Sequence, residues 1–219
     1  MNDVPAAGAT GLVLRDMGAE FAAMLNTPEM VAARSERARI RNELRARALA
    51  EYGSEEAVWA PCDREKALEA GCSRLIVLKP IRGGDLVTLE GWNGGSYDRL
   101  PPEVQAAVAA AWTVPGSPRA AWAELTHWRK RRDERRAFFE DHEDVVWIQA
   151  REALIEHLLD TLPAVSLNDV RARLDWMDYR NDLDCSRGPE REGVLLARLR
   201  ADIERMADAI RDVRGGAVR

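Results

Sequence analysis

The chain contains a charged run that an ordinary packed helix would not contain. Residues 129–136 read RKRRDERR, six bases and two acids, and four more acids follow within the next eight residues. Between Trp128 and Phe138 no apolar side chain is larger than alanine. A helix that packs on a core presents an apolar residue every three or four positions, so the core-facing stripe is interrupted here. The run therefore predicts either full exposure to solvent or contact with a charged partner.

The composition is that of a folded, soluble protein. The chain has 219 residues, enough for one large domain or two small ones. Apolar residues make up 46%, and the high charged fraction of 32% favours long helices with solvated faces. The net charge of −5 gives no general attraction to nucleic acid or to an anionic membrane, so such binding would need a local basic patch. Arginine suits phosphate, but abundant arginine together with alanine indicates GC-rich coding instead.

The sequence shows no targeting or membrane segment. Residues 1–25 have no basic region ahead of an apolar core, so we expect no secretory signal. The longest weakly polar stretch, residues 104–114, is too short to cross a bilayer. Cys62, Cys72 and Cys185 fit neither a zinc site nor a disulfide framework. A reducing cytoplasm is therefore the expected location, and no membrane partner is expected.

The first well-defined predicted helix begins at Pro28, runs to about Tyr52 and carries a stripe of arginines. Thr27 suits the N-cap, Pro28 suits the first turn, and Gly53 ends the helix. Four arginines at spacings of three or four residues share one face: Arg34, Arg37, Arg41 and Arg45. The N-terminal part therefore presents a basic surface of its own.

A change in the apolar period predicts a β-hairpin in the N-terminal part. Residues 74–78 and 86–89 are β-type runs, joined by the turn sequence of residues 82–85. Pro80 favours an edge strand. A lone hairpin is only marginally stable, so it must pack on helices or find a third strand. Helices are expected on both sides of it, over residues 55–70 with an interruption at Pro61, and over residues 103–112.

The sequence TVPGSP at residues 113–118 predicts a domain boundary. It separates a mixed helix and β-hairpin domain, residues 1–116, from a helical domain, residues 117–219. The predicted fold is thus mainly α, with an N-terminal α+β part and a C-terminal helical hairpin or bundle. We expect a fragment from Ser117 to Arg219 to fold alone, because its apolar stripes can cover one another.

The C-terminal part is predicted to form three helices. Ser117-Pro118 opens a helix that we expect to continue to Leu162, with both charge blocks inside it. Ser166 to Asp169 resembles a capping box and starts the second helix. The third has apolar residues at the 3-4-3-4-3 spacing of a coiled-coil seam: Leu196, Leu199, Ile203, Met206, Ile210 and Val213. We expect this third helix to pack antiparallel on residues 145–162.

No familiar catalytic, cofactor or metal motif occurs in the sequence. His127, His142 and His157 are fifteen residues apart, roughly 22 Å along a straight helix, which is too far for a shared ion. The glycine pairs at 83–84 and 94–95 lack the spacing of a phosphate-binding loop, and no serine or cysteine has a nucleophile's context. We therefore expect no catalytic residue, no cofactor, no bound metal, and a protein that is not an enzyme.

Two segments in the C-terminal part resemble proteins of mobile elements. The sequences EALIEHLLDTLPAVSLNDVRARLDWM and LLARLRADIERMADAI are similar to those of uncharacterised helical proteins of bacterial prophages and other mobile elements. The resemblance covers roughly residues 119–213, and Leu162 departs from it by separating Thr161 from Pro163. It implies a phage-like or accessory origin, with a virion as a further expected location, and it implies no reaction and no site.

The first hypothesis for function is a non-catalytic helical module for protein interaction or oligomerisation. A two-fold axis near residues 137 and 138 would lay each basic block against the acidic block of a second copy, as in an antiparallel homodimer. Pairing of the same charges within one helix is the alternative, worth only about 0.2–0.5 kcal/mol a pair. The predicted partner-binding residues are Arg129, Arg131, Arg132, Arg135, Arg136, Phe138, Phe139, Glu140, Asp141, Glu143 and Asp144.

The second hypothesis is nucleic-acid binding through the Arg-rich helices at residues 34–47 and 129–136. Such binding would act through phosphate contacts, without regard to base sequence. The residues expected to make these contacts are Arg34, Arg37, Arg41, Arg45, Arg129, Arg131, Arg132 and Arg135. The net acidity and the acids after the second run favour the first hypothesis.

Overall fold

The computed structural model describes residues 26–94, 100–182 and 189–216, and it is mainly helical, as predicted. The N-terminal part is α+β because it contains a two-stranded antiparallel hairpin. In chain order the elements are α2 (Pro28–Tyr52), α3 (Glu55–Trp59), α4 (Asp63–Cys72), the short 3-10 helix η1 (Ser73–Leu75), β1 (Ile76–Ile81), β2 (Gly84–Leu89), α5 (Pro102–Ala111), α6 (Pro118–Arg136), α7 (Val146–Thr161), α8 (Leu167–Asp182) and α9 (Pro189–Gly216).

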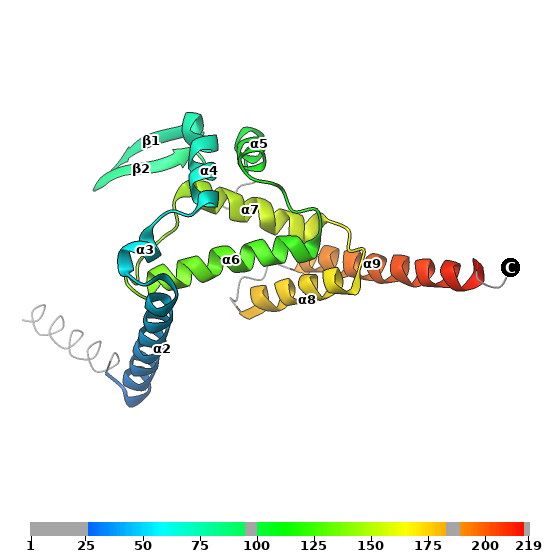
Figure 1. Cartoon of the computed structure of the whole chain (residues 1–219), viewed down its shortest axis with the longest axis horizontal. Helices are drawn as coiled ribbons and strands as arrows, with labels where there is room; N and C mark the ends of the chain where they lie inside the picture. Colours follow the sequence, from blue (N-terminus) through cyan, green and yellow to red (C-terminus); the bar gives the residue numbers. More distant parts are fainter. Residues whose placement is uncertain (1–25, 95–99, 183–188, 217–219) are drawn as a thin grey trace, which may run out of the picture.

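Helix α2 has the ends that the sequence predicts. The Thr27 hydroxyl accepts a hydrogen bond from the Met30 amide at 3.3 Å. Gly53 ends the helix at φ 84°, a left-handed conformation that glycine adopts without strain. Of the 25 residues of α2, only Ala48 is buried, and the helix projects from the body of the protein (Figure 1). Among the described residues, the free end of α2 is therefore held by its own hydrogen bonds and a few ion pairs, with little burial.

The predicted hairpin is confirmed, and it packs on helices as a marginal hairpin must. Ile76 pairs with Leu89 at one end and Ile81 with Gly84 at the other. Leu89 is completely buried in a cluster with residues of α4, α5 and α7, whereas Ile81 near the turn is exposed. The hairpin is thus anchored at its base and free at its tip (Figure 1).

One hydrophobic core crosses the predicted domain boundary at residues 116 and 117. It joins Leu68 of α4 and Val108 of α5 to Trp128 of α6 and to Ile148 and Leu154 of α7. The side chains that meet here come from both predicted domains, so the two parts share their main core. Independent folding of residues 117–219 stays a prediction.

The prediction of one helix from Pro118 to Leu162 is wrong. Helix α6 ends at Arg136, α7 begins at Val146, and the two helices lie antiparallel beside each other (Figure 1). The reversal places Trp128 against Ile148 and Leu154 in the core, which a straight helix would hold far apart. Burial of these side chains favours the turn over continued helix. The acidic block, residues 140–144, consequently lies in the connecting segment.

Helix α8 begins at the predicted capping box and packs across α6 and α7. The Asp169 amide donates to the Ser166 hydroxyl at 3.2 Å, and that hydroxyl donates to the Asp169 carboxylate at 2.7 Å. Trp176 is buried in a second core cluster with Leu125 of α6 and Ile155 of α7. This packing closes the three-helix arrangement of α6, α7 and α8.

Helix α9 packs mainly on α8 and not, as predicted, along residues 145–162. The reason is that Trp176 of α8 covers the face of α7 on which α9 was expected to pack. Arg198 of α9 donates to the Asp160 carbonyl of α7 at 2.9 Å. On α9 itself Leu195 is buried, but Leu196 and Ile203 are 55% and 50% exposed. Leu199 and Met206 are partly buried, and the other two seam residues, Ile210 and Val213, lie outside the described side chains. The far end of α9 extends beyond the body (Figure 1).

Candidate functional site

The second half of α6 buries arginines against a single carboxylate of α4. Arg131 and Arg135 lie 3.1 Å and 2.6 Å from Glu65, and each of the three side chains is no more than 8% exposed. Arg131 also donates to the Ala60 carbonyl at 2.9 Å. Glu65 in turn accepts from the Cys62 amide at 2.7 Å, which caps α4. Of the two environments expected for the charged run, solvent or a charged partner, these two arginines have the second. The partner is Glu65 of the same chain.

Arg132 joins α6 to the acidic connecting segment and to α7. Its Nε atom lies 2.5 Å from the Asp144 carboxylate, and its Nη2 atom pairs with Glu152. The Gln149 amide side chain donates to the Asp144 carbonyl at 2.6 Å. Asp144, a predicted partner-binding residue, is thus committed to contacts that hold the α6–α7 turn.

The pKa values of the two carboxylates paired with α6, Glu65 and Glu152, are shifted in opposite directions. Burial by itself raises the pKa of Glu65, but hydrogen bonds from Arg135 and from the Cys62 amide, with the charges of Arg135 and Arg131, lower it below its ordinary value. Burial also raises the pKa of Glu152, and there the charge of Arg132 is offset by Asp144, so the pKa of Glu152 rises to about 7. The first carboxylate is stabilised as an anion, and the second is not.

The other bases of this run lie nearer the surface and make weaker contacts. The Arg129 guanidinium stacks over the Tyr179 ring, 3.3 Å from its centroid. Lys130 reaches Glu51 of α2 at 2.7 Å. Arg136 is exposed and donates to the His142 carbonyl at 3.0 Å. Of the predicted basic run, Arg136 is the guanidinium that faces solvent near α2.

Three residues of the predicted arginine stripe on α2, Arg34, Arg37 and Arg45, are exposed, and Arg41 is partly buried. Arg34 donates to the Asn26 side chain at 3.1 Å, and Arg45 lies 3.5 Å from Glu55. Arg41 pairs with Glu140, which follows α6. Arg37 has no hydrogen-bond or ion-pair partner within the ranges that the structure describes. These are solvated contacts, which contribute little to stability.

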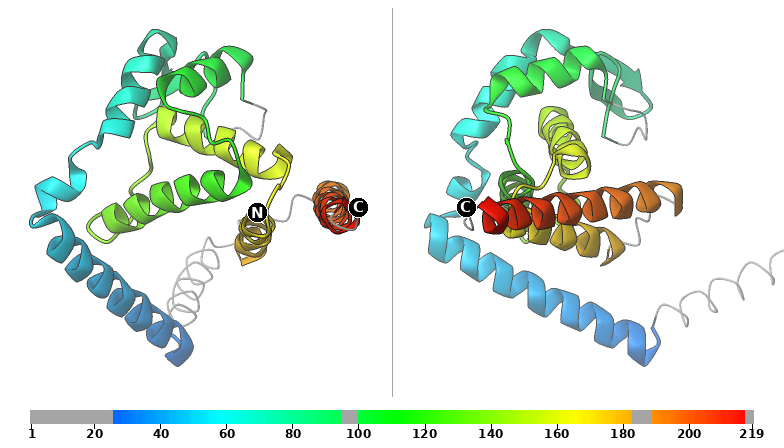
Figure 2. Two further views of the ribbon diagram at one scale, coloured as in Figure 1. Left: turned by 45° about the vertical axis from the view of Figure 1, so that its right-hand side comes forward. Right: turned by 90° about the vertical axis from the view of Figure 1, so that its right-hand side faces the viewer.

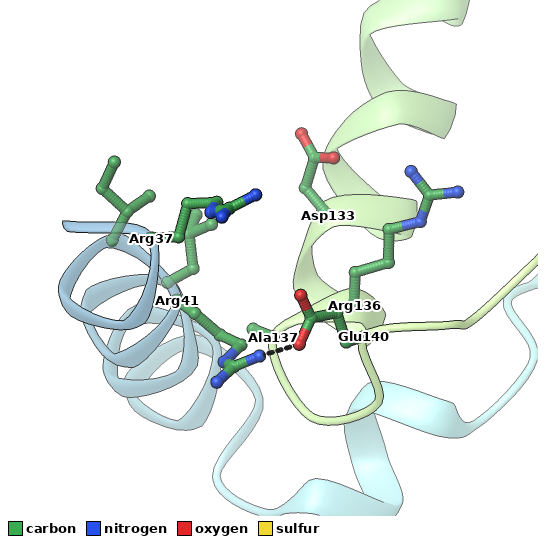
Figure 3. Close-up of a pocket in the computed structure, with 8 residues that line it drawn as sticks. Arg37, Arg41, Asp133, Arg136, Ala137 and Glu140 are labelled. Carbon is green, nitrogen blue, oxygen red and sulfur yellow. Dashed lines mark hydrogen bonds and ion pairs between the residues drawn. The ribbon is translucent and has the colours of Figure 1, made fainter. Parts of the chain in front are cut away.

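A groove between α2 and the end of α6 brings the two basic runs together. It has a volume of about 180 Å³. Its charged lining comes from both helices and from the segment after α6 (Figure 3). The complete lining is Arg37, Ile40, Arg41, Leu44, Asp133, Arg136, Ala137 and Glu140. Three bases and two acids around an apolar floor make this groove the candidate functional site.

The remaining predicted contact residues lie around the turn after α6. Phe138 is partly buried under Arg45, whose guanidinium lies 4.8 Å from the ring centroid. Phe139 is 59% exposed, and Asp141 and Glu143 are exposed as well. Because α6 ends at Arg136, these residues do not continue the helix whose two-fold pairing was predicted. Within the chain, Arg132 of the basic block pairs with Asp144 of the acidic block, and Arg131 and Arg135 pair with Glu65.

Two buried ion pairs were missed in the sequence. Arg151 is completely buried, donates to Glu124 at 2.7 Å and caps the carbonyls of Val108, Trp112 and Thr113 at the end of α5. Its position three residues after Ile148 and four before Ile155, both core residues, was the available signal. Arg173 of α8 pairs with Asp202 of α9, both fully buried. Nothing in the local sequence distinguishes Arg173 and Asp202 from surface charges.

Metal-binding and membrane-spanning features are absent from the described ranges. No group of three or more His, Cys, Asp or Glu side chains there is placed to hold a metal ion. None of the helices described combines the length and the apolar composition that a bilayer crossing requires. Comparison with protein-family models, curated proteins and solved structures found no match to this chain.

Proposed function

We propose that the protein is a non-catalytic helical interaction module that associates with a second copy of itself. The observation that carries this proposal is the exposure of α9, a 28-residue helix whose seam residues Leu196 and Ile203 face solvent. A helix in water derives most of its stability from packing of an apolar face. The uncovered seam is therefore a natural contact surface for another chain.

The antiparallel homodimer predicted from the two charge blocks has fewer residues free to contact a second chain than the sequence suggested. Arg131, Arg132 and Asp144 are engaged within the chain, whereas Phe139 remains exposed beside the candidate groove. Self-association through residues 136–143 would therefore rest on aromatic contact more than on exchange of charge blocks. This interface stays a hypothesis beside the α9 surface.

Light scattering coupled to size-exclusion chromatography tests self-association of the full chain. We expect a concentration-dependent increase in mass over the monomer up to about 100 µM, the range in which a moderate dimer with a micromolar Kd is populated. The mass should change little with salt, because the exposed seam is apolar. A monomer throughout this range would contradict the proposal.

The second candidate function is nucleic-acid binding at the groove between α2 and α6. The observation that favours it is the convergence of Arg37, Arg41 and Arg136 from two separate helices (Figure 3). Arg131, Arg132 and Arg135, predicted to contact phosphate, are instead engaged with carboxylates of the same chain. Any phosphate contact would therefore rest on the α2 stripe together with Arg136.

Salt-dependent binding to a labelled DNA or RNA duplex tests this candidate. Arg37→Glu with Arg136→Glu should then weaken binding to all sequences alike and reduce the salt slope. The control is Arg82→Glu, an exposed base in the hairpin turn far from the groove. Equal binding by the variant and the control would show that the groove does not hold phosphate.

The proposed origin is a prophage or another mobile element, with a cytoplasmic or virion location. It is supported by the resemblance of the segments within residues 119–213, and by nothing in the groove. Phage genes on both sides of the coding sequence, and the protein's presence in purified particles, are the observations that test origin and location.

A further inference from the structure

The segment that connects α6 to α7, residues 137–145, is held to both helices through one guanidinium group. Arg132 of α6 lies 2.5 Å from the Asp144 carboxylate and also pairs with Glu152 of α7. The side chains of Asp144 and Glu152 are only 4% and 12% exposed. One positive charge therefore faces two carboxylates in a site from which most water is excluded.

Glu152 lacks a hydrogen-bond donor for one of its two oxygens. Its Oε2 atom pairs with Arg132, whereas Oε1 is buried and accepts no hydrogen bond from the part of the chain that the structure describes. A buried anionic oxygen without a donor carries a large desolvation cost, and a neutral carboxylic acid carries a smaller one. The geometry therefore favours the protonated form of Glu152.

The titratable and charged groups around Glu152 come from α6, the connecting segment, α7 itself and α8. They are Arg132, Asp144, Glu156 and Tyr179, together with Arg129, whose guanidinium stacks over the Tyr179 ring. Burial, with the charges of Asp144 and Glu156, outweighs the attraction of Arg132 and raises the pKa of Glu152 to about 7. Glu152 consequently changes its charge near neutral pH.

Of the two carboxylates, Asp144 is the one that can move away when Glu152 ionises. Glu152 lies within α7, where backbone hydrogen bonds fix its position, whereas Asp144 lies in a segment of turn and irregular structure. Like charges repel strongly in a site that contains little water. Departure of Asp144 would leave Arg132 and Glu152 as a matched ion pair.

The same segment forms one wall of the groove between α2 and α6. Ala137 and Glu140 line the groove, and Glu140 pairs with Arg41 of α2. The Arg45 guanidinium of α2 lies 4.8 Å from the centre of the Phe138 ring. The segment follows the end of α6 that lies nearest α2 (Figure 2). A change in the segment therefore reaches the groove directly.

We propose that ionisation of Glu152 opens the segment of residues 137–145 and releases Glu140 from Arg41, so that this segment is a pH-sensitive latch on the groove. Below neutral pH, protonated Glu152 leaves Arg132 to Asp144, and the latch is closed. The closed form is favoured fully below about pH 4.5 and loses this advantage as pH rises through about 7, because the pKa of Glu152 is raised only while the latch is closed.

His142, in the same segment, responds to pH in the opposite sense. Its Nε2 atom lies 3.5 Å from Asp144, and its ring packs edge-on against Trp59. Burial lowers the pKa of His142 despite the opposing charge of Asp144, so the closed latch favours neutral histidine. Protonation of His142 therefore opens the latch as pH falls, whereas ionisation of Glu152 opens it as pH rises.

Rapid amide hydrogen exchange in the full-length protein tests the latch. The amides of Phe138, Phe139 and His142 donate backbone hydrogen bonds in the closed segment, so their protection reports its opening. Glu152→Gln is neutral at every pH and retains His142, so its comparison with wild type isolates the effect of Glu152. The ratio of protection in Glu152→Gln to that in wild type should increase by up to about 70-fold between pH 5 and pH 8, because opening returns the pKa of Glu152 toward its ordinary 4.5.

Two further variants show whether the repulsion between Asp144 and Glu152 causes the opening. Glu143→Gln removes an exposed carboxylate next to Asp144 and should leave the pH response of wild type unchanged. In an Asp144→Asn background, Glu152→Gln should have little pH-dependent effect, because Arg132 then compensates Glu152 alone. An equal effect in both backgrounds would contradict the repulsion.

Helix α2 should respond together with the segment. Peptides that contain Arg41 and Arg45 should lose protection in wild type, relative to Glu152→Gln, over the same pH range, because their contacts with Glu140 and Phe138 are released. An open segment with no response in α2 would overturn the link to the groove. This readout concerns conformation, so it stands whether or not the groove binds phosphate.

Two other results would overturn the latch itself. A protection ratio that stays constant between pH 5 and pH 8 would mean that ionised Glu152 turns toward solvent without opening the segment. The same change of ratio at the Glu90 amide, which donates to the Leu75 carbonyl at the base of the hairpin, would mean that Glu152 affects the whole fold and not the segment.

Discussion

The two arginine-rich helices, α2 and the second half of α6, have similar compositions and opposite environments. Arg131 and Arg135 of α6 are buried on Glu65. On α2, Arg37 is exposed and Arg41 pairs with the exposed Glu140, and both arginines line the groove. The difference arises because Glu65 of α4 and the Ala60 carbonyl just before α4 lie against α6, whereas within the described residues only Ala48 of α2 is buried. Similar runs of arginine thus lie partly in the interior on α6 and on the surface on α2.

This comparison also explains why the charged run interrupts an apolar stripe without exposing the helix. A buried ion pair is tolerated where geometry and additional hydrogen bonds offset its loss of water. Glu65 meets that condition through two guanidinium groups and the Cys62 amide. The same arginines without Glu65 would be uncompensated buried charges.

The strongest test of the buried half removes α4 altogether. A fragment of residues 117–219 lacks Glu65, Leu68 and the α5 helix that covers α7. The shared core reverses the expectation drawn from the sequence: we now expect the fragment to lose cooperative thermal unfolding, because Trp128 and Leu154 lose their covering residues. Circular dichroism during heating provides the measurement. A sharp transition would show that the C-terminal part folds alone, as its sequence pattern predicts.

A single substitution at the centre of the cluster should have the next largest effect. Glu65→Ala leaves Arg131 and Arg135 buried without a counter-charge, and we expect the free energy of unfolding to fall by about 3–5 kcal/mol. Urea denaturation followed by fluorescence measures it. The double change Arg131→Met with Arg135→Met, in the Glu65→Ala background, should recover part of the loss. A decrease of less than about 1 kcal/mol would mean that the cluster contributes no more to stability than an exposed ion pair does.

The pH dependence of stability should separate the two buried carboxylates. Because the pKa of Glu152 is raised to about 7, its stabilising contribution is complete below about 4.5 and is lost as pH rises through about 7. Glu152→Gln, which carries no charge, should therefore gain stability over wild type between about pH 5 and pH 8. Glu65, whose pKa is lowered, contributes in the opposite sense and loses its effect as pH falls. Urea midpoints at several pH values give the comparison, and a constant difference between the two proteins would contradict it.

The smallest effect is expected on the exposed helix. Glu36 pairs with Arg39 at 2.6 Å on the surface of α2, with both side chains more than half exposed. Glu36→Ala should leave the urea midpoint within experimental error, because exposed pairs three residues apart are screened by water and salt. A loss comparable to that of Glu65→Ala would mean that α2 packs on another surface in solution.

The predictable parts of the fold are those encoded by neighbouring residues. Thr27, Pro28 and Gly53 define the ends of α2, and the hairpin follows from its turn glycines and the two β-type apolar runs beside them, because caps and turns depend on local geometry. The groove could be anticipated only in part. Its arginines were singled out as two separate stripes, but their meeting depends on how α2 is placed against α6.

The break between α6 and α7 shows where local reasoning ends. Residues 137–145 contain neither proline nor glycine, so helix continuation was the natural prediction. The chain turns there because folding back lets Trp128 meet Leu154 and lets Arg132 reach Asp144 and Glu152. Those contacts join residues distant in sequence, and their free energy exceeds the modest helical preference of a few residues.

The sequence by itself determined the mainly helical class, the ends of α2, the capping box of α8, the hairpin and the presence of two arginine-rich runs. Tertiary structure decided which arginines are buried, where the long helix divides, and which side of α9 remains exposed. The physical reason is the distance along the sequence over which each interaction acts. Caps, turns and apolar periods act over three to seven residues, whereas burial of a charge depends on whether a distant carboxylate arrives to compensate it.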